Sequence, residues 1–443
     1  MYNFRVRRTT IALIIIIMSM VPLSIGFSFF RLYVWNIGFG IALLLDLGSV
    51  CQRNVNSIGR PRVWTIVLLI HAATAPFSTI VSRNPNVNLA ASTQYASIVI
   101  LAIWMRNVAS KSEDFLGSLG AIAVLLVVLQ SSLSVIQQLT FSEFGNLTAY
   151  FGSPETPTLS VVGSTVLTRA RGTLGQPNVV AMWILTLTPF GVIFLSTKWR
   201  ETRFSFYIVV AFVCLSLLGL ALTLSRGMIG LALGALGLLV VAEFFWRPLL
   251  FWRIRKRALL LFAVIVTGLT AIVLLLRNSP IIMIGLALAH RIAEGTRSMG
   301  GDAIWIRTEM IAGGIEIASL YPALGIGFGA SSKIWSDVST KLPRYLNVRI
   351  HNLPILFLAE TGILGMTFYL IAIAVPLVRL LGTYPRDRWW YASMATVLII
   401  IFTSQLYVAP VTADYGPLAW AMLGSIMGMI DNSIRKRTAI LQM

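Results

Sequence analysis

Four short polar clusters hold the side chains best suited to chemistry. They are RARGTLGQPN at residues 169–178, SRG at 225–227, the segment around Arg307, and RIHNLPILFLAETGILG at 349–365. Arginine matches the charge and geometry of phosphate, and a fixed guanidinium group can stabilise an anionic leaving group. Histidine can accept a proton from a hydroxyl near neutral pH. Together these side chains favour a reaction between an anionic, lipid-linked donor and a hydroxyl acceptor.

His351 and Asn352 mark the start of a predicted helix. Asn352 suits an N-cap, with Pro354 in the first turn, so His351 would stand one residue before the helix, at the membrane surface. A lone histidine at a helix entrance is usually structural, and that alternative stays open at this point. Glu360 lies nine residues further on, about 13.5 Å along an ideal helix and half a turn round. We therefore expect Glu360 to be a buried carboxylate bonded to neighbouring spans, or structural, rather than a second acid or base.

Each of three arginines admits a functional and a structural interpretation. Arg171 precedes a Gly/Pro/Asn segment that could bind a ligand or could simply start a capped helix near Pro177. Arg226 has almost no loop around it and would lie near the edge of the hydrocarbon, where an unpaired cation is costly. It could serve a site, or it could reach up to the lipid head groups. Arg307 could serve a site or could be a solvated side chain paired with a nearby glutamate.

Several common kinds of site have no support. The external face shows no carboxylate pair of the glycoside-hydrolase kind, no Asp-x-Asp cluster and no nucleotide-phosphate loop. The two cysteines, Cys51 and Cys214, fall in a basic loop and in an apolar span, so neither a disulfide framework nor a metal site is indicated. With only His71, His290 and His351 available, a histidine metal centre is not expected either. We therefore expect no metal and no cofactor.

The elements that must position these side chains are membrane spans. The chain has 443 residues, 57% hydrophobic and 12% charged, whereas soluble proteins carry about 25% charged residues. The 35 Lys and Arg residues outnumber 16 Asp and Glu residues. In a membrane protein this excess comes from basic cytoplasmic loops, so a nucleic-acid partner is not implied.

Hydropathy predicts an all-α polytopic membrane protein with about twelve transmembrane helices. The first follows Arg5, Arg7 and Arg8 and is interpreted as an uncleaved helix. The distribution of basic residues places both termini in the cytoplasm. Two long external segments, 140–177 and 277–350, remain, and Ala303–Leu320 within the second has a helical pattern that suits the membrane surface, broken by GIGFGA at 325–330. The expected spans are 11–30, 32–50, 63–82, 87–105, 115–139, 178–197, 204–224, 228–246, 258–276, 353–376, 391–410 and 415–430.

These motifs resemble the superfamily of O-antigen ligases and of O-antigen and exopolysaccharide polymerases. The resemblance rests on Arg307, on YPALGIGFG at 321–329 and on HNLPILFLAETGILG at 351–365, with RGTLGQPN at 171–178 and LTLSRG at 222–227 in the same order. The resemblance covers residues 165–380. It implies a single integral membrane domain, 1–443, in which residues 277–350 form a large periplasmic loop.

The resemblance implies a bacterial, inner-membrane glycosyltransferase of GT-C architecture. Such enzymes take a glycan from an undecaprenyl-diphosphate carrier at the periplasmic face and pass it to a hydroxyl acceptor, with inversion and without a metal. By resemblance, Arg226 and Arg307 would bind the diphosphate, Arg171 would add a contact, and His351 would activate the acceptor. Asn352 and Glu360 would support the site.

Three questions stay open at this level. The acceptor could be lipid A-core, a growing glycan or a protein. A transporter or flippase of lipid-linked glycans is an alternative, although transporters usually place ionisable residues near the bilayer midplane. A structural subunit of an envelope complex would need neither Arg226 nor His351.

Overall fold

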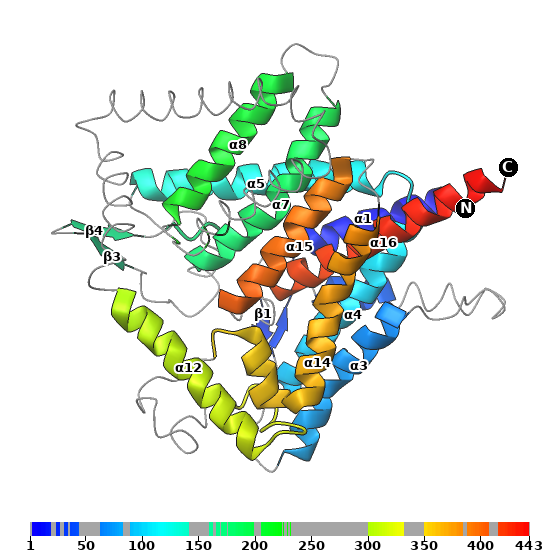
Figure 1. Ribbon diagram of the computed structural model, residues 1–443. Coiled ribbons are helices and arrows are strands. Elements are labelled where there is room, and N and C mark those ends of the chain that lie inside the picture. Colours follow the sequence, from blue (N-terminus) through cyan, green and yellow to red (C-terminus); the bar gives the residue numbers. More distant parts are fainter. Residues whose placement is uncertain are drawn as a thin grey trace. The chain divides into compact units, whose positions relative to one another are not determined.

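Helices make up most of the part of the protein that the structure describes, which also contains two short hairpins (Figure 1). The structure is a computed structural model, and it describes residues 2–18, 24–26, 31–33, 36–43, 63–82, 89–140, 159–162, 165–168, 170–174, 176–198, 205–223, 225, 228, 231, 300–331, 350–383, 388–406 and 415–442. The helices are α1 (Tyr2–Met18), α3 (Val63–Val81), α4 (Leu89–Lys111), α5 (Phe115–Thr140), α7 (Pro177–Lys198), α8 (Ser205–Leu222), α12 (Gly300–Leu320), α14 (Leu353–Gly382), α15 (Arg388–Leu406) and α16 (Gly416–Leu441).

The chain divides into two compact units. The first unit comprises Met1–Leu119 and Ile304–Met443, and the second comprises Gly120–Ala303. In the first unit α4 packs along α16 and α3, and α14 packs against α3 and α15. In the second unit α7 packs against α8.

Among the described residues, four helices are long and apolar enough to cross a membrane: α3, α5, α7 and α14. Shorter apolar helical segments cover Thr9–Met18, Tyr207–Leu222 and Trp389–Ser404. These helices identify a polytopic membrane protein. Helices also occupy the expected spans from 63–82 to 204–224 and from 353–376 to 415–430. The expected spans 228–246 and 258–276 lie almost entirely outside the described residues.

The expected span nearest the N-terminus, 11–30, is wrong as a continuous helix. The next expected span, 32–50, is helical at residues 36–43, and its residues 44–50 lie outside the described part of the chain. α1 ends at Met18, and strands β1 (Ser24–Gly26) and β2 (Arg31–Tyr33) pair antiparallel, with Ile25 opposite Leu32. Hydropathy counts apolar residues without regard to backbone preference. Pro22 and Gly26 both disfavour a helix interior, the first by lacking an N–H and the second through its conformational freedom. A second hairpin joins β3 (Leu159–Val162) and β4 (Thr165–Thr168) within the expected external segment 140–177.

An aromatic cluster forms the core of the first unit. His71 of α3, Tyr95 of α4, Phe357 and Tyr369 of α14, and Trp420 of α16 are all buried. The His71 ring lies 5.1 to 5.8 Å from the other four ring centroids, and its Nε2 is 2.7 Å from the Tyr95 hydroxyl. Because rings from four helices meet here, this cluster fixes α14, the helix that carries His351 at its start.

A buried ion pair joins four helices at another point of the first unit. The Arg106 Nε of α4 donates to Asp431 of α16 at 2.8 Å, and their side chains are only 5% and 3% exposed. Arg106 also donates to Thr65 of α3 and lies over the Trp64 ring. Arg379 of α14 reaches the same carboxylate at 3.4 Å, but its side chain is 40% exposed.

Replacing Asp431 with alanine is expected to destabilise the protein strongly, by about 3–5 kcal/mol, because a buried guanidinium group loses its carboxylate. Replacing Arg379 with glutamine is expected to cost less than about 1 kcal/mol, since that arm of the network is solvated. Thermal unfolding in detergent, followed by tryptophan fluorescence, compares the two variants. Equal losses of stability in the two variants would show that the buried ion pair with Arg106 contributes no more than the solvated contact with Arg379.

Candidate functional site

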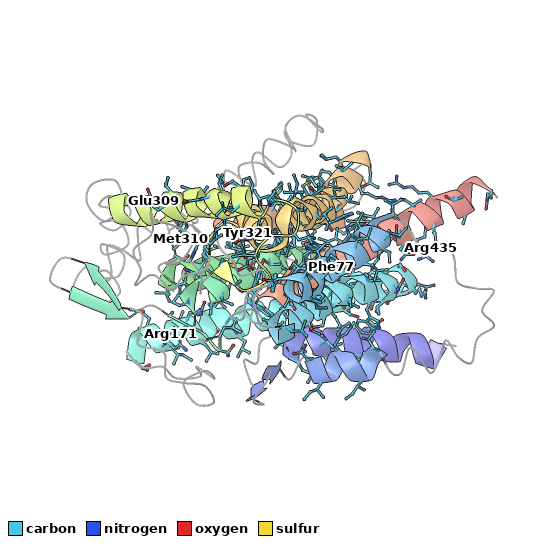
Figure 2. All side chains as sticks on the ribbon, turned by 90° about the horizontal axis from the view of Figure 1, so that it is seen from below. Phe77, Arg171, Glu309, Met310, Tyr321 and Arg435 are labelled. Carbon is cyan, nitrogen blue, oxygen red and sulfur yellow. The ribbon has the colours of Figure 1, made fainter. Side chains whose placement is uncertain are left out.

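α12 carries Arg307 on its buried face. Five residues at helical spacing face inward: Met310, Gly313, Gly314, Ile317 and Ala318. Arg307 lies three residues before Met310 and seven before Gly314, so it extends this face by one turn. The Arg307 side chain is half-buried. Met310 is labelled on this helix in Figure 2, with Tyr321 just beyond its end.

Gly314 brings α12 against the segment that holds His351. A Cβ added at Gly314 would lie 2.5 Å from Ile355 Cγ2 and 3.0 Å from Ile350 Cδ1. Ile350 precedes His351 and is fully buried, and Ile355 is in the first turn of α14. Because glycine has no side chain, α12 packs directly against Ile350 and Ile355, which lie on either side of His351 in the sequence.

His351 stands immediately before the N-cap of α14. Asn352 has extended backbone angles (φ −139°, ψ 112°), and its side-chain oxygen accepts a hydrogen bond from the Ile355 N–H at 3.2 Å. The Leu356 N–H donates to the Asn352 carbonyl at 2.8 Å. The expected start of this helix is thus confirmed, and Asn352 fixes the backbone one residue after the half-buried His351.

α14 breaks at Gly362, and the loop after α12 fills the break. Gly362 has φ +69° and ψ −170°, so the carbonyls of Ala359 and Glu360 lose their normal helical donors. The Ile326 and Gly327 N–H groups donate to these carbonyls instead, each at 3.0 Å. In return the Ile363 N–H donates to the Pro322 carbonyl at 2.9 Å. We call this arrangement of residues 321–331 and 359–363 the loop lock.

The Glu360 side chain completes the loop lock. Its carboxylate accepts from the Gly329 N–H at 2.8 Å, from the Ser331 N–H at 3.2 Å and from the Ser331 hydroxyl at 2.6 Å. Glu360 is fully buried, and these three hydrogen bonds bind it to the loop. Glu360 is therefore a positioning residue, because it holds the loop onto the helix that begins next to His351.

The loop lock also rests on the aromatic cluster. Phe328 lies in the loop, and its ring stacks on Tyr95 with centroids 5.0 Å apart and planes at 19°. Ser82, just after α3, donates to the Ile326 carbonyl at 2.5 Å. The loop is thus attached to α3, α4 and α14 together. Glycine at 325, 327 and 329 has φ between +66° and +100°, a backbone conformation that other residues rarely adopt.

In the second unit, Arg171 lies in a turn held by a glutamine of α5. Gln137 Oε1 accepts from the Arg171 and Gly172 N–H groups, both at 2.9 Å, and its Nε2 donates to the Gly172 carbonyl at 2.8 Å. The Arg171 side chain is only 4% exposed. α7 begins shortly afterwards at Pro177, as expected from the sequence.

A second glutamine, one heptad earlier, holds the next residue of the same turn. Gln130 Nε2 donates to the Thr173 hydroxyl at 2.6 Å, and its Oε1 accepts from the Thr173 N–H at 3.1 Å. Neither glutamine was among the residues expected to serve the site. The sequence does contain a signal for them. The two amides are seven residues apart and therefore lie on one face of an apolar helix, where buried polar side chains need a hydrogen-bond partner.

Replacing Gln137 with alanine is expected to destabilise the protein by about 1–3 kcal/mol, since three hydrogen bonds to the Arg171 turn are lost. Gln138 is a matched control, because it is equally buried on the same helix but neither amide atom has a hydrogen-bond partner among the described residues. Thermal unfolding of Gln137→Ala and Gln138→Ala in detergent makes the comparison. Equal unfolding temperatures would show that the turn does not depend on Gln137.

Arg226 lies outside the described residues. Its neighbour Ser225 is buried, and the Met228 N–H donates to the Ser225 carbonyl at 3.1 Å. The Ala170 N–H donates to the Leu222 carbonyl at 3.2 Å, so the Arg171 turn is bonded to the end of α8, four residues before position 226. The structure therefore brings Arg307 and His351 onto adjoining elements of the first unit, and places Arg171 in the second.

The described residues contain no group of three or more His, Cys, Asp or Glu side chains that could hold a metal ion. The side chains at these positions are guanidinium groups, one imidazole and one carboxylate already hydrogen-bonded to the loop. Such groups can bind an anion and transfer a proton.

Apolar helices long enough to cross a membrane identify an integral membrane protein. A family model described as O-antigen ligase matches residues 210–370. The matched segment includes Arg226, Arg307, the loop lock and His351, whereas Arg171 precedes it. The chain is therefore similar to O-antigen ligases over residues 210–370, which confirms the resemblance and supports a ligase- or polymerase-type role in polysaccharide biosynthesis. No curated protein matches the sequence.

Proposed function

We propose that the protein transfers a glycan from an undecaprenyl-diphosphate carrier to a hydroxyl acceptor at the periplasmic face of the bacterial inner membrane. The observation that carries this proposal is the packing of the Arg307 helix around His351 through Gly314, within the segment that is similar to O-antigen ligases. An anion-binding side chain and a proton acceptor on adjoining elements suit transfer from a diphosphate to an alcohol.

The proposed reaction is a single displacement. The acceptor hydroxyl oxygen attacks the anomeric carbon, and His351 takes the hydroxyl proton as the new C–O bond forms. The bond from the anomeric carbon to the diphosphate oxygen breaks, and the carrier leaves as the diphosphate anion. Attack opposite the leaving group inverts the anomeric configuration, and no metal is required.

Arg307, Arg226 and Arg171 are proposed to bind the diphosphate. A fixed guanidinium group compensates the charge that grows on the leaving oxygen. Arg307 is supported by its position on the inward face of α12, and Arg171 by a turn that two glutamines hold in place. The role proposed for Arg226 is supported by the family match alone. Asn352 and Glu360 are proposed to position the helix and the loop.

The architecture proposed for this function has about twelve spans in one GT-C-type membrane domain, residues 1–443. Both termini are cytoplasmic, 277–350 is a large periplasmic loop, and 165–380 holds the reactive motifs. The partners are the lipid-linked glycan donor, lipid A-core or a growing glycan as acceptor, and membrane lipid, without nucleic acid. A protein acceptor is the third possibility.

A reconstituted assay tests the proposal. Purified protein in liposomes receives an undecaprenyl-diphosphate glycan, a chelator and one acceptor at a time, namely lipid A-core, a second lipid-linked glycan or a peptide. The expected result is acceptor-dependent release of the carrier diphosphate with an inverted linkage in the product. Translocation of the donor across the bilayer without any transfer would replace the enzyme with a transporter.

A further inference from the structure

A pocket of about 350 Å³ opens in the first unit where α4 ends and α5 begins, beside α15 and α16. We call it the α16 pocket. Its charged lining side chains are Glu113, Lys436 and Arg437, and Trp389, Ser112 and Asn432 also line it. A volume of this size is at the lower end of the range for ligand sites, which are usually about 300–1,000 Å³.

The α16 pocket lies where α16 leaves the protein interior. Every residue from Tyr415 to Asp431 is buried, whereas Ile434, Arg435 and Lys436 are exposed. Trp389 comes at the start of α15, and tryptophan is enriched at the depth of the lipid head groups. The change in burial and the tryptophan together place the pocket at a membrane–water interface.

The lining of the pocket is amphipathic and carries excess positive charge. Phe115, Leu116 and Met429 supply an apolar wall next to the polar side chains. Within the described part of the chain, neither Lys436 nor Arg437 forms a salt bridge with a carboxylate. The pocket is thus lined by two cations and one carboxylate, that of the exposed Glu113. A phosphate next to acyl chains would match the cations and the apolar wall at once.

We propose that the α16 pocket binds the head group of an anionic phospholipid such as phosphatidylglycerol. Lys436 and Arg437 bind the lipid phosphate, and the apolar wall contacts the first part of the acyl chains. This site is distinct from the one proposed for glycan transfer. Figure 2 shows Arg435, next to the pocket, and Met310, on the Arg307 helix, toward opposite ends of the first unit.

Native mass spectrometry of the purified full-length protein with equal amounts of phosphatidylglycerol and phosphatidylethanolamine tests this proposal. Lys436→Gln is expected to reduce phosphatidylglycerol occupancy about fivefold. Arg437→Gln is a second variant with the same expectation. Lys198→Gln is the matched control, because Lys198 is likewise an exposed lysine near the C-terminal end of a helix but lies outside the pocket, and it should leave occupancy unchanged.

Glu113 provides a test of whether the pocket prefers an anionic ligand. Glu113→Gln is expected to raise phosphatidylglycerol occupancy, since a carboxylate that repels the phosphate is removed. A decrease would indicate that Glu113 binds an amine, as in phosphatidylethanolamine, and would overturn the proposal. Equal binding of both lipids by the wild type would also overturn it, as would full displacement by soluble glycerophosphoglycerol, which carries the phosphate without acyl chains.

Discussion

Replacing His351 with alanine should lower the rate of glycan transfer by about 10²–10⁴-fold, the usual contribution of a general base. The loss should appear in kcat, because the proposed mechanism assigns donor binding to the arginines and not to His351. Release of the carrier diphosphate in the reconstituted assay measures the rate. Unfolding temperature with and without donor shows whether the variant still folds and binds.

Chemical rescue separates a reacting imidazole from a structural one. Free imidazole added to His351→Ala should restore part of the rate, because the side chain removed leaves room at the entrance of α14. A histidine that only shapes the start of the helix would not be replaced by a diffusing base. Transfer by His351→Ala at the wild-type rate would remove His351 from the mechanism.

Replacing Gly362 with alanine should destabilise the protein by more than about 2 kcal/mol. A Cβ at this position would collide with the Ala323 carbonyl, and φ of +69° is itself unfavourable for alanine. The loop lock would then open or the variant would fail to fold. Yield from the membrane and unfolding temperature in detergent give the result.

Gly382 is the matched control in the same helix. A Cβ at Gly382 would meet nothing within 4 Å, so Gly382→Ala should be neutral or slightly stabilising. If both alanine variants unfold at the wild-type temperature, the break at Gly362 does not need glycine. If Gly362→Ala folds normally but transfers glycan slowly, the loop lock serves catalysis rather than stability.

The sequence predicts those features that depend on neighbours along the chain. Asn352 and Pro354 define a helix start by themselves, because a side-chain acceptor and a proline without an N–H both suit the first turn. The same holds for Pro177 and α7. The helix at 303–320 is also found, since its apolar residues recur at helical spacing.

Features that depend on distant residues could not be predicted in this way. The sequence marks Glu360 as a buried carboxylate, but its partners Gly329 and Ser331 are specified only once the loop meets the broken helix. The contact between His71 and Tyr95 likewise joins two helices, and no periodic pattern in the sequence shows which of their sides face each other. The hairpin at β1 and β2 was missed because apolar content alone does not distinguish a strand from a span.

The loop lock imposes an order on the synthesis of the protein. Ser331 and Glu360 are 29 residues apart, so at about 5–20 residues per second the loop is synthesised roughly 1.5 to 6 seconds before its partner. During that time the Ile326 and Gly327 N–H groups have no carbonyl to bind. A nascent chain stopped before residue 359 should therefore expose this loop to protease, and protection should arise when the broken helix emerges from the ribosome.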